Sequence, residues 1–100
     1  MYLLHGKMTA RTGKVDELTQ ILLEASKLVS TAKGCKVYVI GKEQQQADSV
    51  FVTEIWESKE DHDNSLKVPG VQDLITRAIP LLDGQPNKGQ ELEVLGGWGI

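Results

Sequence analysis

Two histidines are the side chains of this sequence best suited to acid–base chemistry. His62 follows a strand-like segment that ends in Trp56, and His5 lies in an apolar run near the first residue. A free imidazole has a pKa of about 6.5, so either side chain can take up a proton near neutrality. Proton abstraction works best in a dry pocket, which a bulky aromatic side chain such as Trp56 can wall. His62 is therefore the first candidate base and His5 the second.

Each of these residues also has a structural interpretation. His62 belongs to a polar Ser-Lys-Glu-Asp-His run and could be a solvated side chain. His5 could be a hydrogen-bonded strand residue that faces solvent or a partner. Trp56 could anchor the core, stack on an aromatic substrate, or do both, because large aromatic side chains dominate core energetics.

Further polar residues are candidates for holding a substrate. Glu54 shares the side of its strand with Trp56, and a buried carboxylate needs a partner, which Arg77 or Lys7 could supply. Arg77 could instead hold a substrate oxygen or simply be exposed. Tyr38 could donate a hydrogen bond to a ligand or pack within the sheet.

Composition narrows the function classes. The chain has 100 residues, which predicts one domain over residues 1–100, and a net charge of −3, which argues against nucleic-acid binding. One cysteine allows no internal disulfide, and one cysteine with two distant histidines suits zinc poorly, so no metal site is expected. No secretory signal or membrane-spanning run is recognised, and the expected location is the cytoplasm.

Hydrophobic periodicity predicts the elements that would position these residues. Alternation predicts strands over residues 2–9, 35–40, 50–56 and 91–95, and spacing of three and four residues predicts a helix over about 14–32. Ser58, with Asp61 three residues on, predicts the cap of a second helix. That helix is interrupted at Pro69-Gly70 and is expected to kink or end early at Pro80. Loops are expected over residues 41–49 and 83–89.

The order strand, helix, strand, strand, helix, strand predicts an α+β fold of the ferredoxin-like, split β-α-β-β-α-β type. Its four-stranded antiparallel sheet would carry the helices on one face. The other face remains apolar whichever alternation is chosen, and no third helix is expected to cover it. A second copy of the chain is the simplest cover, which predicts a homodimer with its sheets packed face to face.

Several segments in this order resemble the antibiotic biosynthesis monooxygenase (ABM) family of dimeric α+β barrels, in particular its small quinol monooxygenase-like members. The segments are Gly34-Cys35 before a strand with Tyr38, residues 54–60 (EIWESKE), His62 with Ser65-Leu66, residues 79–82 (IPLL), and the closing residues 96–99 (GGWG). The resemblance covers nearly the whole chain.

The resemblance implies a cavity between sheet and helices, with Trp56 at it, in which O₂ oxidises a small quinol or electron-rich aromatic molecule without metal or flavin. Ser65 stands where many relatives carry a histidine, so His62 does not inherit that role. A non-catalytic ligand-binding or structural dimer is the alternative function. Haem breakdown or isomerisation ranks last, because residues 2–9 lack the Asn and residues 57–82 lack the Trp of the haem-degrading branch.

Overall fold

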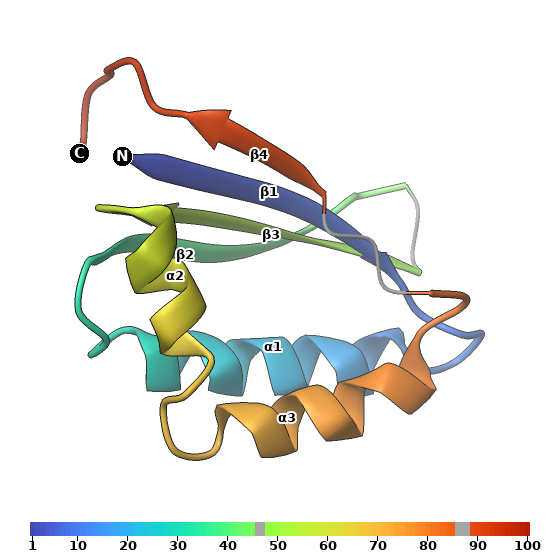
Figure 1. Ribbon diagram of the computed structural model, residues 1–100. Helices are drawn as coiled ribbons and strands as arrows, with labels where there is room; N and C mark the ends of the chain where they lie inside the picture. Colours follow the sequence, from blue (N-terminus) through green and yellow to red (C-terminus); the bar gives the residue numbers. More distant parts are fainter. Residues whose placement is uncertain (46–47, 86–88) are drawn as a thin grey trace.

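A computed structural model describes residues 1–45, 48–85 and 89–100. It contains four strands, three α-helices and one short 3₁₀ helix (Figure 1). In chain order these are β1 (Tyr2–Thr9), α1 (Val15–Val29), β2 (Cys35–Lys42), β3 (Ser49–Trp56), α2 (Lys59–Ser65), α3 (Val71–Ala78), the 3₁₀ helix η1 (Ile79–Leu81) and β4 (Gln90–Glu93). The predicted loops over 41–49 and 83–89 include residues 46–47 and 86–88, which lie outside the described residues.

The strands form one antiparallel sheet in the order β2-β3-β1-β4. The helices lie on one side of this sheet, with α1 and α3 side by side beneath it and α2 close to one end (Figure 1). This arrangement confirms the predicted α+β, ferredoxin-like fold. Among the described residues, no helix could span a membrane; the longest, α1, has 15 residues.

Local signals explain where the second helical region breaks. The Ser58 hydroxyl accepts a hydrogen bond from the Asp61 backbone N–H at 3.0 Å, which confirms the predicted cap. Gly70, at φ 94°, separates α2 from α3. Pro80 lacks an N–H donor, and α3 ends at Ala78 before η1. The predicted interruption at Pro69-Gly70 is confirmed, since α2 and α3 are separate helices, and none of the described helices covers the other face of the sheet (Figure 1).

The two faces of the sheet differ because side chains alternate along each strand. Residues paired across neighbouring strands point to the same face of the sheet. The pairs Gly6–Val52 and Tyr38–Glu54 therefore belong to one set, which faces the helices. Val50, Val52 and Trp56 of this set are buried between the sheet and the helices. We call the opposite side the open face; it carries Leu3, His5, Lys7, Val37, Val39, Phe51, Thr53, Ile55 and Leu92.

Gly34 joins the end of the first helical region to β2 and is held in place by α2. Its φ is 84°, and a Cβ at this position would collide with the carboxylate of Asp61, a residue that is only 9% exposed. We expect Gly34→Ala to destabilise the fold by about 2–4 kcal/mol, because backbone strain and displacement of a buried side chain add. Urea unfolding followed by circular dichroism measures this loss.

Gly13→Ala is the matched control for that substitution. Gly13 has a similar φ of 80°, but no atom lies within 4 Å of the added Cβ. Only the backbone strain remains, so the expected loss is about 1 kcal/mol. Equal losses at the two glycines would contradict a packing role for the contact between Gly34 and Asp61.

Candidate functional site

A cavity of about 250 Å³ lies between the sheet and the helices. Its polar lining consists of Tyr38, Glu54, His62 and Ser65. The remaining lining is apolar and comes from the sheet, all three helices and the residues next to them: Met8, Ile21, Leu22, Ala25, Val29, Leu66, Val71, Leu74, Ile75, Ala78, Ile79 and Leu82. Because Leu66, Ile75 and Ile79 are 39%, 37% and 52% exposed, the cavity opens between α2 and α3.

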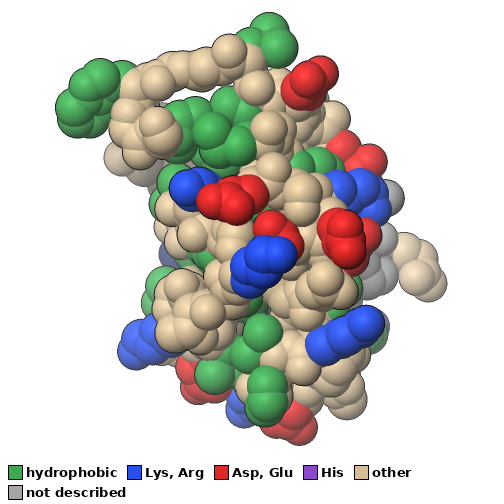
Figure 2. All heavy atoms as spheres, turned by 60° about the vertical axis from the view of Figure 1, so that its left-hand side comes forward, with side chains coloured by type: hydrophobic (Ala, Val, Ile, Leu, Met, Phe, Trp, Pro, Cys, Tyr) green, Lys and Arg blue, Asp and Glu red, His purple; other side chains and the backbone are tan. Residues whose placement is uncertain are grey.

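A wider hollow of about 450 Å³ lies on the other side of α2 and shares Ser65 with the cavity. Its lining is mainly polar or charged and includes Lys33, Glu57, Glu60 and Asp61. The surrounding end of the molecule carries many acidic and basic side chains (Figure 2). The cavity, unlike this hollow, combines an apolar interior with a few convergent polar groups, as ligand sites usually do.

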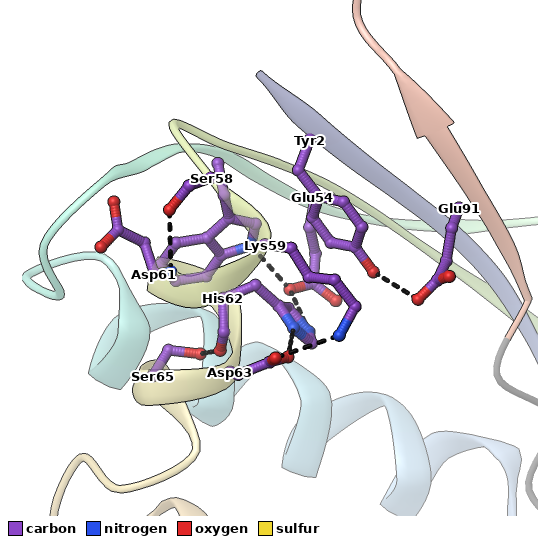
Figure 3. A network of polar contacts seen from close by, with 10 residues as sticks. Tyr2, Glu54, Ser58, Lys59, Asp61, His62, Asp63, Ser65 and Glu91 are labelled. Carbon is purple, nitrogen blue, oxygen red and sulfur yellow. Dashed lines mark hydrogen bonds and ion pairs between the residues drawn. The ribbon is translucent and has the colours of Figure 1, made fainter.

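A cluster of Glu54, Trp56 and the half-buried His62 forms the polar end of the site. Figure 3 shows the side chains of Glu54 and His62 pointing toward each other. The Trp56 indole Nε1–H donates a hydrogen bond to Glu54 Oε1 at 3.0 Å. His62 Nε2 lies 3.8 Å from the same Oε1 atom, and the imidazole meets the indole edge-on with ring centres 5.9 Å apart. Trp56 is fully buried, so its indole holds the Glu54 carboxylate from the side of the core.

The tautomer of His62 follows from its other neighbour. His62 Nδ1 lies 2.9 Å from Asp63 Oδ1, and Lys59 Nζ lies 3.0 Å from Asp63 Oδ2. The hydrogen bond from His62, followed by that from Lys59, lowers the pKa of Asp63. An ionised carboxylate only accepts hydrogen bonds, so Nδ1 carries the proton. In the neutral ring Nε2 then has a lone pair and can accept a proton.

Burial shifts the other ionisable groups of this end. It raises the pKa of Glu54, and the Trp56 hydrogen bond and the charge of His62 offset only part of that shift. Burial and then the nearby Glu54 carboxylate raise the pKa of Tyr38, which keeps its hydroxyl protonated. Burial and a 3.0 Å hydrogen bond from its hydroxyl to Glu91 Oε1 raise the pKa of Tyr2 to about 12.

The sequence profile of the antibiotic biosynthesis monooxygenase family matches residues 1–77. The chain belongs to this family. A search among curated proteins found no match. The family resemblance carried by residues 54–60 and by the neighbouring segments is thereby confirmed.

Solved structures share the fold over nearly the full length. A provisionally assigned antibiotic biosynthesis monooxygenase from Chloroflexus aurantiacus J-10-fl is 38% identical, with a TM-score of 0.87 over 99% of this chain and 97% of that one. A similarly assigned protein from Deinococcus radiodurans is 23% identical, with a TM-score of 0.83 over 100% and 98%. The cofactor-independent oxygenase SnoaB from Streptomyces nogalater is 12% identical, with a TM-score of 0.81 over 99% and 97%.

Within this ABM domain, the two predicted histidines lie on opposite sides of the sheet. His62 lines the cavity, and 16% of its side chain is exposed. His5 lies on the open face, where its Nδ1 is 3.0 Å from Thr53 Oγ1 and its ring stacks on Phe51. The catalytic role of either residue stays a prediction, and the geometry favours His62.

The expected charge partners of Glu54 were wrong. Arg77 lies outside the cavity, with its guanidinium 3.2 Å from Glu24 Oε2 and 3.6 Å from Asp73 Oδ2. Lys7 lies on the open face, over the Phe51 ring. The partners of Glu54 are instead an indole and an imidazole, because β3 and α2 bring Trp56 and His62 to its side of the sheet.

Three further residues of the candidate site were not proposed as site residues from the sequence, although Ser65 was named as the position at which many relatives carry a histidine. Asp63 orients His62, and its position next to His62 in the chain was an available signal. The ring of Tyr2 lies 5.5 Å from that of His62, because Tyr2 pairs with Trp56 across β1 and β3. Ser65 lines the cavity and donates a hydrogen bond to the His62 carbonyl oxygen.

Among the described residues, no three His, Cys, Asp or Glu side chains are grouped as a metal site.

We expect Glu54→Gln to flatten the pH dependence of stability. The pKa of Glu54 is raised in the folded state, so that state binds the proton more tightly than the unfolded chain. Stability is then greatest below the ordinary carboxyl pKa and is lost as the pH rises through the raised value. The free-energy difference between Glu54→Gln and the parent chain should therefore grow in favour of the variant from pH 4 to pH 8. Urea unfolding across that range measures it, and a constant difference would contradict the raised pKa.

Proposed function

We propose that this ABM protein is a cofactor-independent monooxygenase that oxidises a small quinol or other electron-rich aromatic molecule with O₂. The observation that carries this proposal is the orientation of His62, whose Nε2 lone pair lies at the polar end of an otherwise apolar cavity. Such a cavity can hold an aromatic ring and place its hydroxyl group beside a base.

Proton transfer to His62 would start the reaction. O₂ in its ground state reacts slowly with closed-shell molecules, and a quinol becomes a good one-electron donor only after it loses a proton. His62 Nε2 takes that proton, Asp63 stabilises the resulting imidazolium through Nδ1–H, and the Tyr38 hydroxyl can donate to the substrate oxyanion. The aliphatic lining from α1 and α3 keeps bulk water away from the reactive anion.

The overall reaction balances without any other reductant. One oxygen atom of O₂ enters the quinol ring, and the other leaves as water together with two hydrogens of the substrate. The quinol becomes a hydroxyquinone, and its own electrons reduce both oxygen atoms. The proton held by His62 is returned when water departs, so the protein ends in its starting state.

Oxygen consumption with a panel of menadiol-type quinols and polyphenols tests the proposal. Rates are corrected for enzyme-free autoxidation. Mass spectrometry of the product formed under ¹⁸O₂ measures how many labelled oxygen atoms it contains. One labelled oxygen atom per hydroxyquinone is expected. Uptake that never exceeds autoxidation across the panel would overturn the proposal and favour a non-catalytic binding protein.

The proposed assembly is a homodimer that buries the open face. Val39 and Leu92 of this face are 54% and 47% exposed in the single chain, and an apolar sheet face of this kind favours association. We expect a dimer in sedimentation velocity at micromolar concentration, and Val39→Lys should shift it toward monomer. Lys27→Ala, on α1, is the control that leaves the dimer intact. A monomeric parent chain would contradict this assembly.

A further inference from the structure

The described lining of the cavity offers a ligand no positive side chain apart from His62 in its protonated form. Among its described lining residues there is no lysine or arginine. The nearby cations are engaged elsewhere: Arg77 pairs with Glu24 and Asp73, and Lys59 pairs with Asp63. A ligand that enters the cavity already charged would therefore meet aliphatic walls and the Glu54 carboxylate, with the neutral Tyr38 hydroxyl as a donor but no cation to balance its charge.

The electrostatics of this end disfavour any ligand carboxylate. Moving an unpaired charge out of water is unfavourable, and a second carboxylate beside Glu54 adds repulsion. His62 cannot compensate, because it already lies between Glu54 Oε1 and Asp63 Oδ1, at 3.8 Å and 2.9 Å. An uncharged hydroxyl group meets none of these costs.

The same end suits a neutral hydroxyl group. His62 Nε2 can accept its proton, and the Tyr38 hydroxyl, which makes no hydrogen bond to any residue in the described part of the chain, can donate to its oxygen. A hydroquinone oxygen both donates and accepts, so it can satisfy both groups at once.

The size of the cavity limits the ring system. At the packing density of a protein interior, about 0.75, a cavity of 250 Å³ holds about 190 Å³ of ligand. That is room for one or two fused aromatic rings with small substituents. A four-ring polyketide or a haem would extend out of the cavity through the opening between α2 and α3.

We infer that the site selects uncharged hydroquinones of one or two rings and rejects analogues that carry a carboxylate. This inference rests on the proposed function for the quinol class, and it adds the charge and the size of the substrate. The residues responsible are Glu54, which repels the anion, and Tyr38 with His62, which recognise the hydroxyl.

Anaerobic calorimetry with a matched ligand pair tests the inference. The pair is 2-methyl-1,4-naphthohydroquinone and 1,4-dihydroxy-2-naphthoate, which share the ring system and differ in a methyl group or a carboxylate. At pH 7.5 the carboxylate should bind about 30-fold more weakly or worse, as expected for an unpaired anion beside a like charge. Equal or tighter binding of the carboxylate, or no binding of either ligand, would overturn the inference.

Two variants identify the cause of the selectivity. Glu54→Gln keeps the size and the hydrogen-bond acceptor for Trp56 but removes the negative charge, and it should reduce the 30-fold gap to about fivefold. Ile75→Lys places a cation at the cavity mouth, where the residue is 37% exposed, and should strengthen binding of the carboxylate at least tenfold. If neither variant changes the gap, Glu54 is not its cause and the inference fails.

The same ligands separate this inference from the proposed function. Tight binding of the neutral hydroquinone without ¹⁸O incorporation would overturn the monooxygenase and leave the ligand selectivity intact. If both ligands bound equally tightly and both incorporated ¹⁸O, the monooxygenase would stand and the ligand selectivity would be overturned.

Discussion

Replacing His62 by Gln is expected to lower quinol-dependent O₂ uptake by about 100-fold or more, the usual contribution of a positioned general base. Glutamine can still accept a hydrogen bond, but it has no nitrogen that takes up a proton near neutrality. The loss should appear mainly in kcat, because the apolar lining that binds the ring remains. Oxygen-electrode rates at saturating menadiol measure it, and circular dichroism verifies that the variant is folded.

His5→Gln is the matched control for the loss of an imidazole. His5 lies across the sheet from the cavity and contacts Thr53 and Phe51. Its replacement should leave kcat within about twofold of the parent value, since it cannot reach a substrate in the cavity of the same chain. A large loss for His5→Gln with normal activity for His62→Gln would reverse the assignment and place the reaction at the open face.

Local signals were sufficient to predict most of the fold. The Ser58 cap, the Pro69-Gly70 break and the helix end before Pro80 each depend on the chemistry of one or two residues, and the structure contains all three. Strand alternation likewise separated the set of Val52, Glu54 and Trp56 from its neighbours. These features are readable because a cap, a turn or a pleat involves residues only a few positions apart.

The candidate site was harder to predict, because it depends on contacts between elements. The pairing of Glu54 with His62 requires the direction in which α2 leaves β3, and that direction is set by packing of α2 against the sheet. Tyr2 reaches His62 only through the register of β1 and β3. Arg77 and Lys7 are suitable partners for Glu54 by charge alone. In the structure Glu54 is buried and instead accepts a hydrogen bond from the indole N–H of Trp56.

Trp56 shows how the role of a residue can change when its surroundings are known. The family resemblance placed its indole at the cavity, where it could stack on a substrate. In the structure Trp56 is fully buried and is absent from the lining described above, although it contacts His62, which does line the cavity. Its indole N–H holds the Glu54 carboxylate, so Trp56 influences the site through Glu54 and is a positioning residue.

Truncating Trp56 should therefore have the largest effect on stability of any substitution in this site. Trp56→Ala removes a fully buried side chain, and such truncations cost about 3–5 kcal/mol. A small domain has about 5–15 kcal/mol in total, so this variant should be close to unfolding at 37 °C. Urea unfolding at 15 °C and at 37 °C measures the loss, and Trp98→Ala is the control, because Trp98 is fully exposed in the single chain.

Trp56→Phe separates the hydrogen bond from the packing. The phenyl ring fills most of the space, but Glu54 loses the donor that lowers its pKa, so the pKa of this carboxyl rises further. The folded state then binds the Glu54 proton still more tightly, and stability should fall more steeply than in the parent chain as the pH rises above the ordinary carboxyl pKa. Unfolding free energies at pH 5 and pH 8 test this. Trp98→Phe is the control. If the two variants show the same pH dependence of stability, the indole N–H of Trp56 does not hold the Glu54 carboxylate. The activity of Trp56→Phe should in that case equal that of the parent chain.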